Sequence, residues 1–227
     1  IEENYLTYDF FDILIINELG SKSINKKFKA INTSSSKKIT GMNGIFREIF
    51  KKKSILKNYK YCCFVEDDNF IFPNSLFKSQ KFLDNNNDYI ACSGKSFIFS
   101  KINKKYSYLN SYLSPNTVDN MDASIRFQTY NKALCYYNLF RKEYFFRILK
   151  KVSLIKDDNM SEVFFNFLSI KFGRIKKLNC IYLAREYPRP KIYNIPHKKE
   201  WIKNKHLLKD VKIVIDHIDS NNSNNLS

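Results

Sequence analysis

Glycine and proline are scarce, with 5 of each among 227 residues, which excludes collagen-like and low-complexity chains. Long apolar runs are lacking as well. The best one, Phe10–Ile16, is interrupted by Asp12 and falls far short of the ~18 apolar residues of a membrane span. The five cysteines form no CxxC pair, so neither a zinc module nor a disulfide scaffold is expected, and free thiols in a reducing cytoplasm are the simplest interpretation.

Negative charge is the other shortage, since 22 Asp and Glu face 39 Lys and Arg and the net charge is +17. A basic surface attracts nucleic acid, anionic membranes or phosphorylated substrates. However, the basic residues are 32 Lys and only 7 Arg, and phosphate recognition favours the planar Arg side chain. The charge therefore indicates a mild preference for anionic partners. Nucleic acid is an unlikely partner, because no RNP, KH or zinc-finger signature appears.

What is abundant is apolar and aromatic surface, at 44% and 16% of the residues, which is enough for a substantial core. Strand-like and helix-like patterns alternate along the chain. Strands are predicted over residues 10–17, 27–32, 59–65, 89–93, 96–100, 133–140 and 178–183, and helices over residues 37–52, 73–83, 142–152, 159–172 and 207–218. Residues 101–120 show no period and are expected to form a long loop.

This alternation favours an α/β fold, with a mainly parallel sheet flanked by helices on both faces. The expected organisation is one domain over residues 1–195, followed by a basic C-terminal helix and a disordered tail over residues 196–227. In such sheets ligands bind outside the carboxyl ends of the strands. That rule directs attention to the acidic residues that follow the apolar run ending at Val65.

Three consecutive carboxylates, Glu66, Asp67 and Asp68, follow that predicted strand. Because side chains alternate in an extended segment, Glu66 and Asp68 share one side and Asp67 points the other way. Two carboxylates on one side supply the hard oxygen ligands that Mg²⁺ or Mn²⁺ prefers. The alternative is a solvated acidic turn that caps the helix beginning at Pro73.

The stretch YKYCCFVEDDNFIFPNSLFKSQKFLDNNNDYIACSG resembles the core of the nucleotide-sugar-dependent glycosyltransferases of the GT-A fold. It is closest to a bacterial group with a triple aspartate after a strand, matched here by Glu66–Asp68, with Pro73 and Gly94 following. NKALCYYNLFRKEYF resembles the segment in which an aromatic strand leads into an arginine, here Arg141. KDDNMSEVFFNFLSIKFGRIKKLNCIYLARE resembles the acidic helix, glycine, strand and arginine that close the catalytic domain.

The resemblance implies a GT-A-like (Rossmann-like) catalytic domain and a metal-dependent glycosyltransferase. In this family Mn²⁺ or Mg²⁺ holds the diphosphate of a nucleotide-sugar donor, which implies Asp68 and Glu66 as metal ligands. It also implies that Asp67 faces the ribose or the sugar and that Gly94 belongs to the donor site. Arg185 and Arg141 would neutralise the leaving diphosphate, with a surface salt bridge as the alternative for each.

Inverting enzymes of this kind need a carboxylate that deprotonates the acceptor hydroxyl. Glu162 is the preferred candidate, because its spacing to Gly173 is similar to that between the family's base and its glycine. Asp158 is the second candidate, although helix capping is an equal alternative for Asp158 and for Asp157.

The N-terminal part departs from the family pattern, because residues 1–9 are too few to supply the strand and loop that hold the nucleotide base. Either the fold lacks its first strand, as expected of a piece of a longer protein, or the resemblance is incomplete.

Three functions therefore remain open. The first is transfer of a sugar to a surface-polysaccharide or lipid-linked acceptor, by a cytoplasmic enzyme at the inner face of the plasma membrane. The second is a basic nucleic-acid-binding or metal-dependent nuclease domain, and the third is a non-catalytic glycosyltransferase-like domain.

Overall fold

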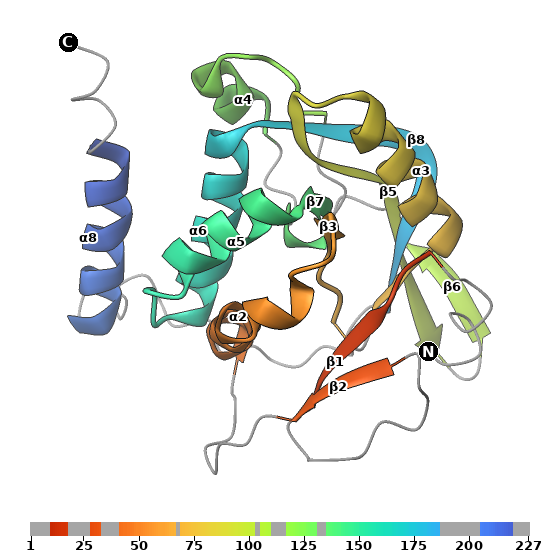
Figure 1. Cartoon of the computed structure of the whole chain (residues 1–227), viewed down its shortest axis with the longest axis horizontal. Coiled ribbons are helices and arrows are strands. Elements are labelled where there is room, and N and C mark those ends of the chain that lie inside the picture. Colours follow the sequence, from red (N-terminus) through yellow and green to blue (C-terminus); the bar gives the residue numbers. More distant parts are fainter. Residues whose placement is uncertain are drawn as a thin grey trace.

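The computed structural model describes residues 10–17, 28–32, 41–66, 69–102, 105–109, 117–130, 135–186 and 205–219. It is a mixed α/β protein in which a curled sheet lies between helices (Figure 1). The strands are β1 (Ile13–Asn17), β2 (Phe28–Asn32), β3 (Tyr61–Cys62), β4 (Asn69–Ile71), β5 (Tyr89–Ile102), β6 (Lys105–Leu109), β7 (Leu139–Arg141) and β8 (Arg174–Glu186). The helices are α2 (Gly41–Lys51), α3 (Pro73–Asn85), α4 (Ala123–Thr129), α5 (Lys142–Val152), α6 (Asp158–Phe172) and α8 (Lys205–Asp219), with 3₁₀ turns η1 (Lys53–Leu56) and η2 (Cys135–Tyr137).

The main sheet has the strand order β3-β7-β5-β8-β4, with β6 paired to β5. Only β5 and β8 are parallel, and every other pair in this sheet is antiparallel. The prediction of a mainly parallel sheet is therefore wrong. Alternating strands and helices form a parallel sheet only when each helix connects two neighbouring parallel strands. Here α5 and α6 follow β7 in succession, and both pack against α2.

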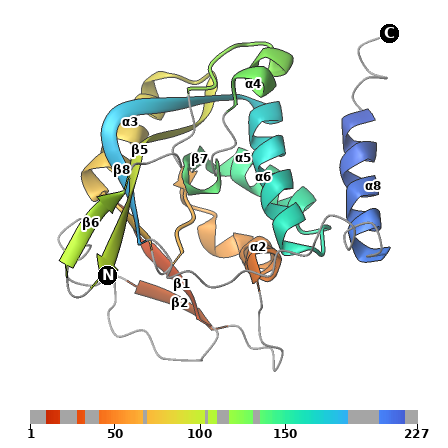
Figure 2. The same cartoon turned by 180° about the vertical axis from the view of Figure 1, so that it is seen from behind.

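Helices flank both faces of this sheet, as the sequence predicted. In the β5–β7 ladder Ala91 faces Phe140 and Cys92 faces Leu139, so neighbouring pairs lie on opposite faces. The ring of Phe140 packs against Phe145 of α5 at 5.9 Å and against α6, whereas the thiol of Cys92 interacts with α3. Figure 2 shows α3 and α6 separated by the strands.

The first two strands form a separate parallel pair, with Ile13 opposite Phe28. Both were predicted, and within the described residues neither pairs with the main sheet. Burial of the first strand on both faces was expected, but Phe10 is exposed and Ile13 and Leu14 are only half-buried. Phe10 instead packs against Phe77 of α3, 5.4 Å between ring centroids. This pair of strands thus lies beside the main sheet rather than extending it (Figure 1).

The helices agree with the sequence patterns better than the strands do. The bounds of α5 are those predicted, and no end of α3, α6 or α8 differs from its prediction by more than two residues. Four assignments need correction. Residues 59–65 contain only the two-residue β3, and residues 89–93 and 96–100 belong to the single strand β5. Residues 101–120 contain the end of β5 and β6 rather than loop alone, and residues 133–140 include η2 and the start of β7. The segments 1–9 and 187–204 and the predicted tail after Asp219 lie outside the described residues.

Aromatic packing joins the helices to the loop that carries the acidic motif. Phe46 of α2 stacks on Phe165 of α6 with 5.2 Å between ring centroids, and both rings are fully buried. Phe64, two residues before Glu66, packs edge-on against Phe46 and Tyr136. The start of the acidic motif is therefore fixed by the core, although the strand leading to it ends at Cys62.

Candidate active site

Glu66 is the acidic residue of the motif that the structure describes. Its side chain is half-buried, and its backbone carbonyl accepts a hydrogen bond from the N–H of Asn69 at 3.1 Å, which turns the chain into β4. Asp67 and Asp68 lie outside the described residues, so the pairing of Glu66 with Asp68 stays a prediction. Among the residues that are described, no three His, Cys, Asp or Glu side chains form a cluster that could hold a metal ion.

Three side chains from different elements meet the same oxygen of Glu66, Oε2. The amide Nδ2 of Asn69 in β4 donates to it at 3.0 Å, and the hydroxyl of Tyr137 in η2 donates to it as well. The guanidinium Nη2 of Arg185 in β8 lies 3.8 Å away. Asn69 and Arg185 are register partners in the β4–β8 ladder, so the sheet itself brings both to Glu66.

Glu162 interacts electrostatically with Glu66 and Arg185, although it lies far from Glu66 in the sequence. The pKa of Glu162 is raised to about 7, mainly by burial in α6 and then by the negative charges of Glu66 and Asp158, while Arg185 opposes the shift. The structure therefore brings together Glu66, Glu162 and Arg185, three residues that the sequence singled out. A carboxyl group with a pKa near neutrality can accept a proton at physiological pH.

Two adjacent tyrosines line this cluster, with ring centroids 4.5 Å apart. Both side chains are buried, and burial raises the pKa of Tyr136 and of Tyr137 well above the usual value. Glu162 and Glu66 add to the shift at Tyr136. Both hydroxyl groups thus stay protonated over the working range of pH, and Tyr137 acts as a neutral hydrogen-bond donor to Glu66.

Two acidic residues at the start of α6, Asp157 and Asp158, serve as helix caps. Asp157 accepts a hydrogen bond from the N–H of Met160 at 2.9 Å and so caps its own helix, and Asp158 accepts one from the N–H of Asn43 in α2 at 2.9 Å. A Cβ at Gly41 would lie 1.9 Å from the carboxylate of Asp158, and the φ of Gly41 is +74°. Capping, the alternative weighed for both residues, therefore describes their contacts, and a catalytic role for Asp158 stays a prediction.

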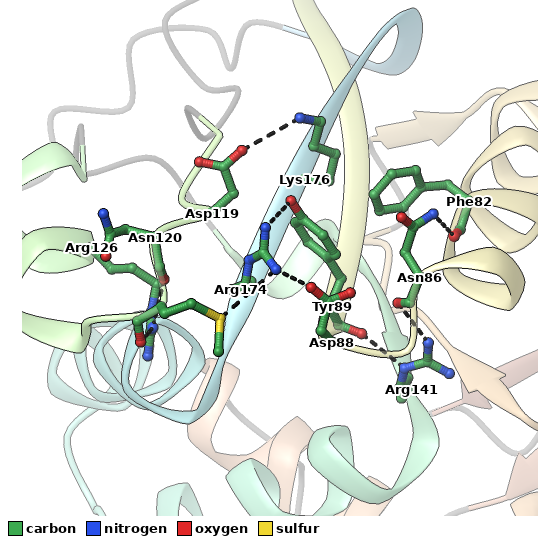
Figure 3. Close-up of polar contacts among 11 residues, drawn as sticks. Phe82, Asn86, Asp88, Tyr89, Asp119, Asn120, Arg126, Arg141, Arg174 and Lys176 are labelled. Atoms are coloured by element: carbon green, nitrogen blue, oxygen red, sulfur yellow. Dashed lines mark hydrogen bonds and ion pairs between the residues drawn. The ribbon is translucent and has the colours of Figure 1, made fainter.

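Arg141 lies beside Asn86 and Tyr89 (Figure 3). Its side chain is buried, and its guanidinium donates to the carbonyls of Leu83 at 2.6 Å, Asn86 at 3.0 Å and Tyr89 at 2.8 Å. Its contacts hold the end of α3 and the start of β5. They are neither a surface salt bridge nor a contact with Glu66, so sequence reasoning missed this structural role.

Gly94 occupies an irregular part of the β5–β8 ladder, where the register shifts between Ser93 and Lys95. A Cβ at Gly94 would lie 2.4 Å from the carbonyl oxygen of Cys180. The close approach of β8 accounts for glycine at this position, and a contact with a donor stays a prediction.

Sequence reasoning missed Asn69 and Tyr137. Asn69 directly follows the acidic triplet, and a polar residue next to a motif is a signal that could have been followed. Tyr137 lies in a segment predicted as a strand, where it would have alternated with Tyr136 instead of turning toward Glu66.

No protein-family model matches the chain, and a comparison with curated proteins finds no match. Within the described part of the chain, no helix combines the length and apolarity that crossing a bilayer requires. The geometry around Glu66 is therefore the main structural evidence that bears on function.

Proposed function

We propose that this chain is a metal-dependent glycosyltransferase, which moves a sugar from a nucleotide-diphosphate donor to a polysaccharide or lipid-linked acceptor. The observation that carries the proposal is that Arg185 lies 3.8 Å from Glu66 and that the charges of both act on the buried Glu162, although the three come from separate segments. The sequence resemblance assigns these three residues to metal binding, proton abstraction and diphosphate binding. The antiparallel sheet gives no support to a GT-A fold, so the proposal rests on this cluster and on the motif order.

Glu162 serves as the general base in this proposal. Its pKa of about 7 leaves a large fraction ionised at neutral pH, while its basicity is much higher than that of an ordinary carboxylate. It takes the proton of the acceptor hydroxyl as that oxygen attacks the anomeric carbon, and the bond from the anomeric carbon to the diphosphate oxygen breaks. Arg185 supplies positive charge beside Glu66, where a departing diphosphate would gather negative charge.

The residues around Glu66 fit a divalent cation in their donor chemistry. Hard carboxylate oxygens suit Mg²⁺ and Mn²⁺, and every hydrogen bond described for the Glu66 side chain goes to Oε2, none to Oε1. Glu66 and Asp68 would hold the ion, which would supply charge neutralisation for the diphosphate when bound. A cytoplasmic location at the membrane face remains part of the proposal, on the strength of the +17 net charge.

The test is sugar transfer or donor hydrolysis with a panel of nucleotide sugars, with and without Mn²⁺, using the full chain and the variant Glu162→Gln. Loss of the base should lower turnover by about 10²–10⁴-fold while donor affinity stays nearly unchanged. Glu143→Gln on the exposed side of α5 is the matched control and should keep wild-type turnover. Full activity of Glu162→Gln would exclude Glu162 as the base.

Salt-dependent DNA binding by a chain that does not respond to any donor would instead favour the nucleic-acid alternative. In that case the proposed function fails as a whole, whatever the behaviour of single variants.

A further inference from the structure

Two hydrogen-bond donors address one oxygen of Glu66, Oε2, and no hydrogen bond to the other oxygen, Oε1, is described. Asn69 Nδ2 lies 3.0 Å from Oε2 and 3.1 Å from the hydroxyl of Tyr137, which itself donates to Oε2. The Glu66 carboxylate, the Asn69 amide and the Tyr137 hydroxyl therefore close a ring of hydrogen bonds. We propose that Asn69 and Tyr137 are positioning residues, which hold Oε2 of Glu66 so that Oε1 is presented to a bound divalent cation. This inference deepens the proposed function and rests on it.

The chemistry of the groups fixes the direction of each hydrogen bond. An ionised carboxylate can only accept, so the nitrogen of the Asn69 amide must face Glu66, and its oxygen must face away. The hydroxyl of Tyr137 has one hydrogen, which goes to Glu66, and its lone pairs accept from Asn69. A flipped amide would turn its oxygen toward the carboxylate and break the ring, so only one orientation of the Asn69 amide is compatible with it.

Burial makes this ring rigid. Asn69 and Tyr137 are 7% and 3% exposed, and the ring of Tyr137 packs against the fully buried Tyr136. The amide oxygen of Asn69 is itself buried and has no hydrogen-bond partner in the described structure. A buried unpaired acceptor lowers the stability of the fold. An asparagine at position 69 is therefore better explained by its hydrogen bond to Glu66 than by core packing.

The experiment is a titration of the full chain with Mn²⁺ alone. Electron paramagnetic resonance measures the concentration of free Mn²⁺ at each step. Groups that orient a metal ligand typically contribute 10–100-fold to metal affinity, so Tyr137→Phe should bind Mn²⁺ at least ~10-fold more weakly. Tyr182→Phe is the matched control, because its buried hydroxyl donates to the carbonyl of Tyr137 at 3.0 Å rather than to Glu66. It should lose similar thermal stability and keep wild-type Mn²⁺ affinity.

Equal Mn²⁺ affinity in Tyr137→Phe and the wild type would overturn the inference, and so would an equal loss in the two Tyr variants. Either result would leave the proposed function standing. A wild-type chain that binds no Mn²⁺ would overturn both. Should Tyr137→Phe fail to fold, Asn69→Ala provides the same comparison, with the same loss expected and the same unchanged affinity as the contradicting result.

Discussion

Arg126 and Arg185 use the same side chain in opposite ways. Arg126 is 4% exposed and donates four hydrogen bonds to backbone carbonyls, those of Asn120, Met121, Ile170 and Lys171. Arg185 is 23% exposed and lies beside the carboxylate of Glu66. Figure 3 shows Arg126 together with Arg141, which also donates to backbone carbonyls.

The difference separates scaffold from candidate site in a chain with only seven arginines. A guanidinium that neutral carbonyls satisfy is held in the core, and its charge is not available to a ligand. A guanidinium beside a partly exposed carboxylate can exchange that partner for a phosphate. Arg141, which the sequence assigned to the diphosphate, belongs with Arg126 by this criterion.

The largest effect is expected from Arg126→Met, which should break the scaffold side of the comparison. Removal of the guanidinium leaves buried carbonyls at the end of α6 without donors, so the free energy of unfolding should fall by about 4 kcal/mol. Chemical denaturation measures this change. Arg147→Met is the control: this exposed Arg lies over the ring of Phe172, and its loss should cost less than about 1 kcal/mol. Equal effects would contradict the assignment of Arg126 to the core.

A smaller effect, specific to the site, is the pH dependence that Glu162 gives to stability. Its folded pKa is about 7 and its ordinary value is 4.5, so between these values the folded chain keeps a proton that the unfolded chain has released. Stability contributed by Glu162 therefore falls as pH rises from 4.5 to 7 and is constant above that, with a total of at most about 3 kcal/mol.

The measurement is urea unfolding from pH 4 to 8, with Glu162→Gln as the variant that cannot ionise. The difference in stability between wild type and Glu162→Gln should change with pH in the stated window. Glu143→Gln, exposed in the first turn of α5, should show no such difference. A pH-independent difference would mean that Glu162 has an ordinary pKa.

Much of the helical part of the fold could be predicted from the sequence, because apolar side chains recur at helical spacing and Pro73 and Asp157 mark helix starts. Strand direction could not be predicted. The strands β3, β4 and β7 have only two or three residues, and their pairing depends on tertiary contacts that no local pattern encodes. The division of residues 133–140 into a 3₁₀ turn and a strand was hidden for the same reason.

Of the candidate site, the sequence predicted the charged residues and missed the neutral ones. Glu66, Glu162 and Arg185 drew attention as carboxylates and as a rare arginine at expected places. Asn69 and Tyr137 act through one hydrogen bond each to Glu66, and that role appears only when η2 and β4 are placed beside each other. Asp158 could not be separated from a catalytic carboxylate because its partner, the N-terminus of α2, lies far away in the sequence.

The smallest stability effect should come from Arg185→Met, which tests the site side of the comparison. Its pair with Glu66 is partly exposed, so the free energy of unfolding should change by less than about 1 kcal/mol. The pKa of Glu162 should nevertheless rise, because Arg185 lowers that pKa in the folded protein. The measurement is an NMR titration of the Glu162 side-chain carboxyl, with Arg185→Lys as the variant that keeps the charge and should restore most of the shift. If the pKa of Glu162 is the same in all three proteins, the guanidinium does not act on the proposed base, and the contrast with Arg126 is only one of exposure.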